Sequence, residues 1–199
     1  MPANKITDYF YLKDNKLVVL KGVYEPLDDS YLLAESIPHI QKEKTALDLG
    51  CGSGIQGINL ILLGAKKVVF ADKNPIALKN AEKNLQSLKL KNYELIETDL
   101  FENIKEKFDI ITFNPPYVDS ESIKYIEVDG GKKGREILDL FLEKVKEHLN
   151  AKGEVFFVQS IHNGLIKTKK ILKNNGFKFE IIAKKKLFFE ELVVFKAWI

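Results

Sequence analysis

The chain has 199 residues, of which 45% are hydrophobic and 30% are charged. This composition is typical of a folded globular domain, and we expect a single α/β domain over residues 1–199. The 31 basic and 28 acidic residues leave a net charge of +3, which is too balanced to indicate a nucleic-acid partner by itself. No apolar run reaches the roughly 18 residues needed to span a bilayer, so no membrane contact is expected.

The cysteine content and the N-terminal residues narrow the possible classes of protein further. Cys51 is the only cysteine, which excludes an intramolecular disulfide, and no Cys/His cluster has the spacing of a zinc site. The N-terminus has no apolar signal sequence. We therefore expect a cytoplasmic enzyme or binding module without a metal.

Residues 1–22 are expected to form an N-terminal extension, and residues 23–199 the main part of the domain. In the extension, a hairpin around Asp14-Asn15 joins Tyr9–Leu12 to Leu17–Leu20. A helix follows, capped by Asp28, Asp29 or Ser30 and running to about Ile37.

The rest of the chain alternates short β-rich runs with helical periodicity, which predicts βαβ units on a mostly parallel sheet. Asn74-Pro75 is a typical helix start, and Asn175-Gly176 a typical helix end. Between them, a further helix has an apolar face from Leu138 to Leu149. The final two strands have no helix between them and should pair antiparallel. The expected strands are Thr45–Leu49, Lys67–Ala71, Tyr93–Thr98, Phe108–Phe113, Gly153–Ser160, Phe177–Ala183 and Glu191–Trp198.

The first of these strands runs into a glycine-rich turn, Asp48-Leu49-Gly50-Cys51-Gly52-Ser53-Gly54. Such a turn lets the backbone approach a ligand closely at the start of a helix. The spacing also fits the dinucleotide pattern G-x-G-x-x-G, with Gly57 as its last glycine. A carboxylate at Asp48 suits a cationic ammonium group better than a phosphate.

Acidic residues follow the next two strands. Asp72 is placed to accept the hydroxyls of a ribose, as a carboxylate does at this position in nucleoside sites. Asp99 can accept from the exocyclic amine of an adenine, with Leu100 or Phe101 against the ring.

The fourth strand ends in Asn114-Pro115-Pro116-Tyr117, the most specific motif of the chain. The prolines stiffen the loop and remove two N–H donors. Asn114 and the carbonyl of Pro115 offer two acceptors, and Tyr117 offers a flat aromatic face. Together they could hold a planar NH2 group that donates two hydrogen bonds.

In this order, these motifs resemble those of class I S-adenosylmethionine-dependent methyltransferases that act on amino groups. More narrowly, residues 23–30 and 129–136 resemble the HemK-type glutamine methyltransferases of peptide chain release factors, in their short archaeal and eukaryotic branch. The resemblance runs from about Val23 onward and implies a Rossmann-like, seven-stranded sheet with a reversed last strand and helices on both faces. The helical domain of the bacterial branch is not expected.

The resemblance also implies roles for individual residues. The methionine part of S-adenosylmethionine would lie over Asp48, Gly50 and the glycine turn with Gly52, and Ser30 matches a hydroxyl position that contacts this cofactor. Asp72 would take the ribose, and Asp99 with Leu100 the adenine. The target glutamine amide would be held by the catalytic loop, Asn114, Pro115, Pro116 and Tyr117.

Two other functions remain open on sequence alone. The same loop could hold a flipped adenine or guanine for N6 or N2 methylation of DNA or RNA, with Tyr117 stacking on the base. The lysine-rich segment 167–186 could then contact phosphate. A non-catalytic nucleoside- or dinucleotide-binding module is the third possibility, against which the complete Asn-Pro-Pro-Tyr motif argues.

Three further expectations concern partners and loops. Short relatives in the resembling branch work with a small zinc-containing activating subunit, and the edge strand Tyr93–Thr98 is the expected site of such a heterodimer. The long connection Val118–Gly134 is expected to line the substrate entrance. Arg135, the only arginine, suggests a bidentate carboxylate contact that lysine could not reproduce.

Overall fold

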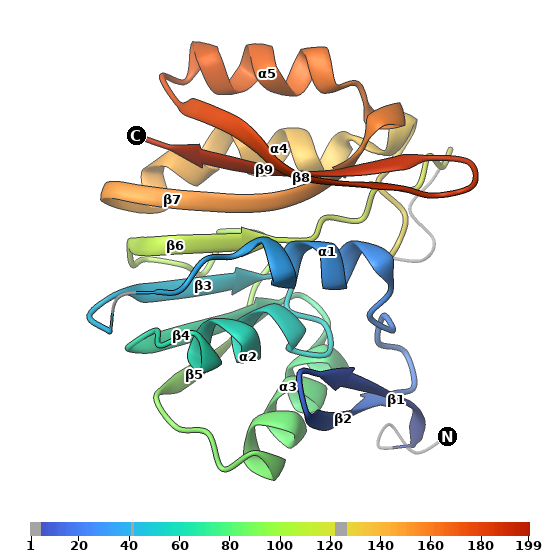
Figure 1. Ribbon diagram of the computed structural model, residues 1–199, viewed down its shortest axis with the longest axis vertical. Helices are drawn as coiled ribbons and strands as arrows, with labels where there is room; N and C mark the ends of the chain where they lie inside the picture. Colours follow the sequence, from blue (N-terminus) through green and yellow to red (C-terminus); the bar gives the residue numbers. More distant parts are fainter. Residues whose placement is uncertain (1–4, 41, 122–126) are drawn as a thin grey trace.

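The computed structural model describes residues 5–40, 42–121 and 127–199. Its main sheet has seven strands in the order β5-β4-β3-β6-β7-β9-β8 (Figure 1). β9 runs antiparallel to both of its neighbours, whereas the other pairs are parallel, so the predicted reversed last strand is confirmed. The strands are β3 (Thr45–Leu49), β4 (Lys67–Asp72), β5 (Tyr93–Glu97), β6 (Phe108–Phe113), β7 (Leu149–Ser160), β8 (Lys178–Lys186) and β9 (Glu191–Trp198).

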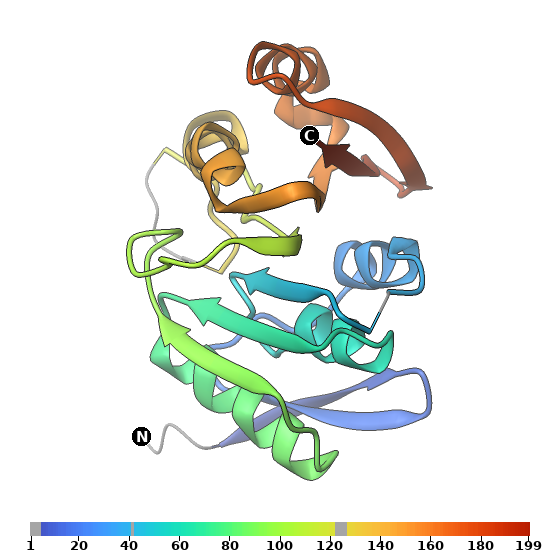
Figure 2. The same cartoon turned by 90° about the vertical axis from the view of Figure 1, so that its left-hand side faces the viewer.

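The helices lie on both faces of this sheet (Figure 2). They are α1 (Asp28–Ser36), α2 (Ile55–Leu62), α3 (Pro75–Ser87), α4 (Glu136–Lys144) and α5 (Leu165–Asn174), with short 3-10 turns η1 (Lys132–Gly134), η2 (Val145–His148) and η3 (Ile161–Asn163). One apolar core joins the sheet to α1, α2 and α3, and a second joins it to α4 and α5. Neighbouring residues of one strand enter different cores, as Val68 and Val69 do, because side chains alternate across a strand.

The N-terminal hairpin, β1 (Ile6–Leu12) and β2 (Asn15–Leu20), forms a separate two-stranded sheet that lies beside α3 (Figure 1). Two buried amides of α3 replace a third strand. Asn84 accepts from the backbone N–H of Val18 at 2.9 Å, and Asn80 accepts from that of Leu20 at 2.6 Å. Asn84 also donates to the carbonyl of Ser53 at 2.9 Å, which connects the hairpin to the glycine-rich turn.

Several details of the expected elements are wrong. The helix predicted through Leu149 ends at Lys144, because Leu149 already belongs to β7, and β8 runs past the expected Ala183 to Lys186, because its last residues still pair with β9. The predicted side-chain cap of α1 is absent: Leu27 occupies the cap position, because Asp29 and Ser30 make other contacts. β7 begins at Leu149, not at Gly153, because Leu149 pairs with Phe108 before the strand register shifts. The start of α3 is as predicted, with the Asn74 side chain accepting from the N–H of Ile76.

Candidate active site

A cavity lies where β5, β4, β3 and β6 reach their carboxyl ends, the usual ligand position in an open α/β sheet. The structure brings almost all of the predicted site residues to it. Those that line it are Ser30, Gly50, Gly52, Asp72, Asp99, Leu100, Asn114, Pro115, Pro116 and Tyr117.

The glycines of this segment have two different roles: one lets a ligand approach the backbone, and another lets a helix pack closely on the sheet. At Gly52, φ is +52°, which favours glycine, and an added Cβ would meet no atom within 4 Å. Open space therefore lies over the turn at this point. Gly57 has the opposite role, because a Cβ there would overlap the ring of Phe70, so this glycine lets α2 pack closely on β4.

Asp48 is the exception among the predicted residues. Only 1% of its surface is exposed, and it does not line the cavity. Its carboxylate lies under the turn, where Oδ2 accepts from the N–H of Gly57 at 2.7 Å and Oδ1 from the hydroxyl of Thr112 at 3.5 Å. The direct contact with an ammonium group is thus not supported. The strand points this side chain into the sheet-to-helix junction, where it holds the turn.

Asp72 presents a fixed carboxylate to the cavity. Its Oδ2 accepts from the N–H of Gly52 at 2.9 Å, and its Oδ1 accepts from the N–H of Asn74 at 2.8 Å. Burial raises the pKa of Asp72, while these hydrogen bonds oppose the rise. Each oxygen still has a free lone-pair direction for a ligand hydroxyl.

At the end of β5, Asp99 and Leu100 line the cavity, whereas Phe101 does not. The ring of Phe101 instead stacks on His148 in the second core, with centroids 4.3 Å apart. Leu100 has a φ of +48°, a conformation that is uncommon for a branched side chain and is found at functional sites. Asp99 remains largely exposed, with the ammonium of Lys73 3.9 Å away.

The amide of Asn114 is oriented by a hydrogen-bond relay. Nδ2 of Asn114 donates to the hydroxyl of Ser30 at 3.2 Å, and that hydroxyl donates to Oδ1 of Asp29 at 3.2 Å. Among the described residues, no group donates to Oδ1 of Asn114, although this atom is buried. Because the relay engages the nitrogen, the oxygen is left as an acceptor for a ligand.

Asp29 also holds two tyrosines of the cavity wall. Its Oδ2 accepts from the hydroxyl of Tyr24 at 3.1 Å and from that of Tyr117 at 3.2 Å. Burial, and then the charge of Asp29, raises the pKa of both tyrosines well above the usual range. Both hydroxyls therefore stay protonated at neutral pH, and the ring of Tyr117 is fixed in place.

Sequence reasoning missed Gln56, which comes from the first turn of α2 and lines the cavity. Its Nε2 donates to the carbonyl of Ser30 at 2.8 Å. Its Oε1 is buried and accepts from no described group. An unpaired buried acceptor in a cavity is a candidate contact for a ligand cation, but a glutamine inside an apolar helix gives no such signal in the sequence.

Sequence comparison identifies the family. The family described as methyltransferase small domain matches residues 16–189, most of the chain. The chain belongs to this methyltransferase family. The family-level resemblance predicted from the motifs is therefore confirmed, and the cavity is the candidate active site of a methyltransferase.

Two relatives of this methyltransferase are informative. A protein of Methanocaldococcus jannaschii, whose name assigns it provisionally to the protein N5-glutamine methyltransferases, is 43% identical over 92% of this chain and 95% of its own length. A release factor glutamine methyltransferase of Aquifex aeolicus is 31% identical over 90% of this chain and 69% of its own length.

Solved structures support the predicted class I methyltransferase fold. The E. cuniculi Mtq2-Trm112 complex, described as responsible for methylation of the termination factor eRF1, matches with a TM-score of 0.71 at 24% identity, over 89% of this chain and 98% of that chain. The T. thermophilus 16S rRNA N2 G1207 methyltransferase RsmC, in complex with AdoMet and guanosine, matches with a TM-score of 0.73 at 21% identity, over 100% of this chain and 52% of that chain.

The loop after the Asn-Pro-Pro-Tyr motif of this methyltransferase reaches the cavity where the structure describes it. Val118, Glu127, Val128 and Asp129 line the cavity, and Val118 and Asp129 form a parallel β-bridge. Residues 122–126, also part of the expected entrance segment, lie outside the described residues. A change in hydrogen exchange along this loop on substrate binding stays a prediction.

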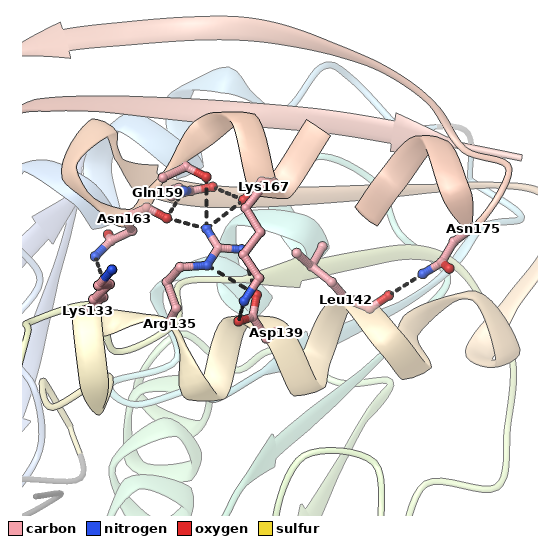
Figure 3. A network of polar contacts seen from close by, with 10 residues as sticks. Lys133, Arg135, Asp139, Leu142, Gln159, Asn163, Lys167 and Asn175 are labelled. Atoms are coloured by element: carbon pink, nitrogen blue, oxygen red, sulfur yellow. Dashed lines mark hydrogen bonds and ion pairs between the residues drawn. The ribbon is translucent and has the colours of Figure 1, made fainter. Parts of the chain in front are cut away.

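Arg135 of the methyltransferase is 6% exposed and connects α4 to η3 and α5 (Figure 3). Nε and one terminal nitrogen, Nη2, donate to the same oxygen of Asp139, at 3.2 and 2.6 Å. The other terminal nitrogen, Nη1, donates to the carbonyl of Asn163 and, at 3.0 Å, to the hydroxyl of Thr168. The predicted carboxylate contact is present, although both donors converge on one oxygen.

Cys51 also lines the cavity, in surroundings that disfavour its thiolate. Burial raises the pKa of its thiol well above the ordinary value, and the charges of Asp72 and Asp48 raise it further. Among residues 5–40, 42–121 and 127–199, no group of three or more His, Cys, Asp or Glu side chains could hold a metal ion. No described helix is both long and apolar enough to cross a membrane.

Proposed function

We propose that this methyltransferase transfers the methyl group of S-adenosylmethionine to the side-chain amide nitrogen of a glutamine in a peptide chain release factor. The observation that carries the proposal is the buried, unpaired Oδ1 of Asn114, which the relay through Ser30 leaves free in the Asn-Pro-Pro-Tyr loop. A glutamine amide offers the N–H that such an acceptor needs. The names of the Methanocaldococcus and Aquifex relatives support the same substrate class.

The residues of the cavity fit the cofactor. The open space over Gly52 suits the close approach of a ligand to the backbone, and the fixed carboxylate of Asp72 suits a ribose diol. The free Oε1 of Gln56, not Asp48, is the side-chain acceptor that suits the ammonium group. Leu100 and Asp99 would take the adenine. When bound, S-adenosylmethionine supplies a methyl group on a sulfonium, a good leaving group.

The protein's own contribution is positioning, because an amide nitrogen is a poor nucleophile with a delocalised lone pair. Oδ1 of Asn114 and the carbonyl of Pro115 would accept the two amide N–H groups and so aim the nitrogen lone pair. Such alignment lowers the barrier by several kcal/mol in favourable cases. As the nitrogen gains positive charge, the same acceptors bind it more strongly than they bind the neutral amide.

Among the described residues, Tyr24, Tyr117 and Asp29 are not placed to act as a general base for this nitrogen. Both tyrosine hydroxyls stay protonated, since burial raises the pKa of Tyr24 and Tyr117. The Asp29 carboxylate already accepts from both tyrosines. The amide proton, which becomes acidic once the nitrogen is methylated, would leave to water after transfer.

Methylation of a nucleic-acid base is the second candidate function. The same acceptors and the ring of Tyr117 could hold a flipped base. In the lysine-rich segment 167–186, which could contact phosphate, Lys167 already pairs with Asp139 at 2.6 Å and Lys185 with Asp28 at 2.7 Å.

The test offers the chain S-adenosylmethionine with a labelled methyl group and one substrate at a time. We expect label in a release factor that carries a Gly-Gly-Gln loop, and none when that glutamine is replaced by alanine. DNA and RNA serve as parallel substrates. Label in nucleic acid, with none in the release factor, would replace the proposed substrate by a base.

A small activating subunit is the proposed partner, bound at β5. This strand lies at the edge of the sheet, as predicted, and Leu95 and Ile96 are half-buried there. Such an edge can accept a strand from another chain. Leu95→Lys should abolish formation of the heterodimer and spare cofactor binding, whereas Glu180→Lys on β8, at the opposite edge, should not. Full activity of the isolated chain on the release factor, with no small zinc protein co-purifying from the native host, would contradict the proposal.

A further inference from the structure

The turn between β8 and β9 exposes two adjacent aromatic side chains. Phe188 is 91% exposed and Phe189 is 85% exposed, and among the large apolar residues that the structure describes only Ile166, at 85%, matches them. Their rings contact each other edge to face, with centroids 4.5 Å apart. Two exposed phenylalanines in contact form a small apolar surface, which in a folded protein usually has a binding role.

Turn geometry does not explain these residues. The N–H of Leu187 donates to the carbonyl of Glu190 at 2.7 Å, so Phe188 and Phe189 are the two residues that reverse the chain. Neither phenylalanine has a positive φ, so this turn does not require the Asn, Asp or Gly of the usual two-residue hairpin loops, and polar residues would fit it equally well. Two large apolar rings exposed to water do not stabilise the turn.

The backbone of this turn is fixed by contacts with the rest of the protein, although its two aromatic rings are exposed. Leu187 is half-buried and packs against the same core as Tyr117. Lys185 forms an ion pair of 2.7 Å with Asp28 at the start of α1, and Nε2 of His162 lies 3.0 Å from the carbonyl of Phe189. The two aromatic rings are therefore presented from an anchored hairpin, which limits the ordering cost of binding.

This hairpin ends beside the candidate active site. In Figure 1 the β8–β9 turn lies on the side toward which β3 and β6 point, the side of the cavity. Lys185 contacts Asp28, whose neighbour Asp29 holds Tyr117. After burial and Asp29, the charge of Glu190 is a further cause of the raised pKa of Tyr24 and Tyr117.

The residues that precede Asp28 and His162, which hold the hairpin in place, are apolar and exposed as well. Leu27, which precedes Asp28, is 53% exposed, and Ile161, which precedes His162, is 36% exposed. The charges near the tip are mixed, because Lys184, Lys185 and Lys186 precede it and Glu190 and Glu191 follow it, and Lys185 is already paired with Asp28. An apolar surface with balanced charge suits a protein better than a phosphate backbone.

We propose that Phe188 and Phe189 dock the protein substrate, by contacting an apolar surface of the release factor outside the loop that enters the cavity. This inference rests on the proposed function and adds a second contact to it. Exposed aromatic residues often dominate the binding energy of such interfaces. The cavity then recognises the target side chain, while the hairpin selects the protein that carries it.

The test uses the double variant Phe188→Ser/Phe189→Ser, with Tyr9→Ser/Tyr11→Ser as the matched control. The control also removes two exposed aromatic rings from a hairpin, in this case the β1–β2 hairpin beside α3. Binding of the intact release factor is measured by calorimetry on full-length chains saturated with S-adenosylhomocysteine. Methyl transfer to the factor and to a short peptide with its Gly-Gly-Gln loop is measured in parallel.

We expect the Phe188/Phe189 variant to bind the intact factor about tenfold more weakly or worse, as loss of an aromatic anchor does. Its melting temperature, its affinity for S-adenosylhomocysteine and its turnover of the peptide should match those of the wild type, and the Tyr9/Tyr11 control should bind the factor normally.

Wild-type affinity in the Phe188/Phe189 variant, with an active wild type, would overturn the docking proposal alone. A wild type that neither binds nor methylates the factor would overturn the proposed function and the docking proposal together. Loss of RNA binding in this variant, with no effect on the factor, would reassign the surface to nucleic acid.

Discussion

Nδ2 of Asn114 donates a hydrogen bond to the hydroxyl of Ser30 at 3.2 Å, although 84 positions separate the two residues in the chain. The contact joins the loop after β6 to the first turn of α1 and fixes which end of the amide is free. A rotated amide would present an N–H donor to a substrate that itself donates. The side chain of Ser30 is thus a positioning group for the acceptor that the proposed reaction needs.

Asn114→Ala removes this acceptor. We expect turnover on the release factor to fall by about 100-fold or more, because oriented contacts to the developing charge are lost. Cofactor affinity, measured by calorimetry, should stay close to that of the wild type. Near-normal turnover on every substrate tested would exclude the positioning mechanism.

Ser30→Ala keeps Asn114 but frees its amide to rotate. We expect kcat to fall by about tenfold while KM for the protein substrate changes little, as when an interaction formed mainly in the transition state is weakened. Ser30→Thr retains the hydroxyl and should restore most of kcat. Equal losses in the alanine and threonine variants would indicate a packing role instead.

Asp72→Ala tests the ribose contact. Loss of hydrogen bonds to a charged acceptor, worth about 1.5–3 kcal/mol, should weaken S-adenosylmethionine binding by about one to two orders of magnitude. Asp99→Ala, at an exposed carboxylate of the same cavity, serves as the matched variant and should have a smaller effect. Calorimetry distinguishes the two, and unchanged affinity of the Asp72 variant would remove this residue from the site.

The raised pKa of Asp48 predicts that the free energy of unfolding depends on pH. Burial, together with the charge of Asp72, raises the pKa of Asp48 to about 7 from 3.8. Between these values the folded chain keeps a proton that the unfolded chain releases. The contribution of this group to the free energy of unfolding is therefore present below pH 3.8 and is lost as pH rises through 7.

Asp48→Asn has no such titration and retains an oxygen that can accept from Gly57. We expect the stability of the variant relative to the wild type to increase from about pH 4 to about pH 7 and then to level off. Urea unfolding at a series of pH values measures this difference. A difference that does not change over this range would show that folding does not raise the pKa of Asp48.

Arg135→Lys should lower the free energy of unfolding by about 2 kcal/mol, because one ammonium cannot reach both Asp139 and the Asn163–Thr168 group. Cofactor affinity should not change, since Arg135 does not line the cavity. The comparison variant is Lys167→Ala, which removes the exposed partner of Asp139 and should cost less than about 1 kcal/mol. Equal stability of Arg135→Lys and the wild type would mean that this network adds nothing.

Much of the sheet could be predicted because its central strands are continuous apolar runs. Phe108–Phe113 begins and ends as predicted, since burial on both faces leaves a clear signal between polar turns. The resemblance supplied the reversed last strand and the edge position of β5. The docking of the hairpin could not be predicted, because Asn80 and Asn84 look like ordinary polar helix residues until their backbone partners are known.

The site residues that belong to sequence motifs were predicted, and those that depend on long-range contacts were missed. Residues at strand ends, such as Asp72 and Asn114, converge because parallel strands end at one edge. Asp48 was assigned to the cavity because its position in the motif does not show which way the side chain points. Asp29 was considered only as a helix cap, since nothing local indicates that two tyrosines donate to its carboxylate.

The position of β9 has a consequence for synthesis of the chain on the ribosome. β9 pairs with β7 and β8 and lies between them, yet it follows every other strand in the sequence. The half of the sheet that carries the nucleoside contacts, from β5 to β6, can therefore assemble while β7 still has an unpaired edge. Until β9 emerges, that edge is open to pairing with other chains, and a nascent chain stalled in this interval is the form most exposed to aggregation.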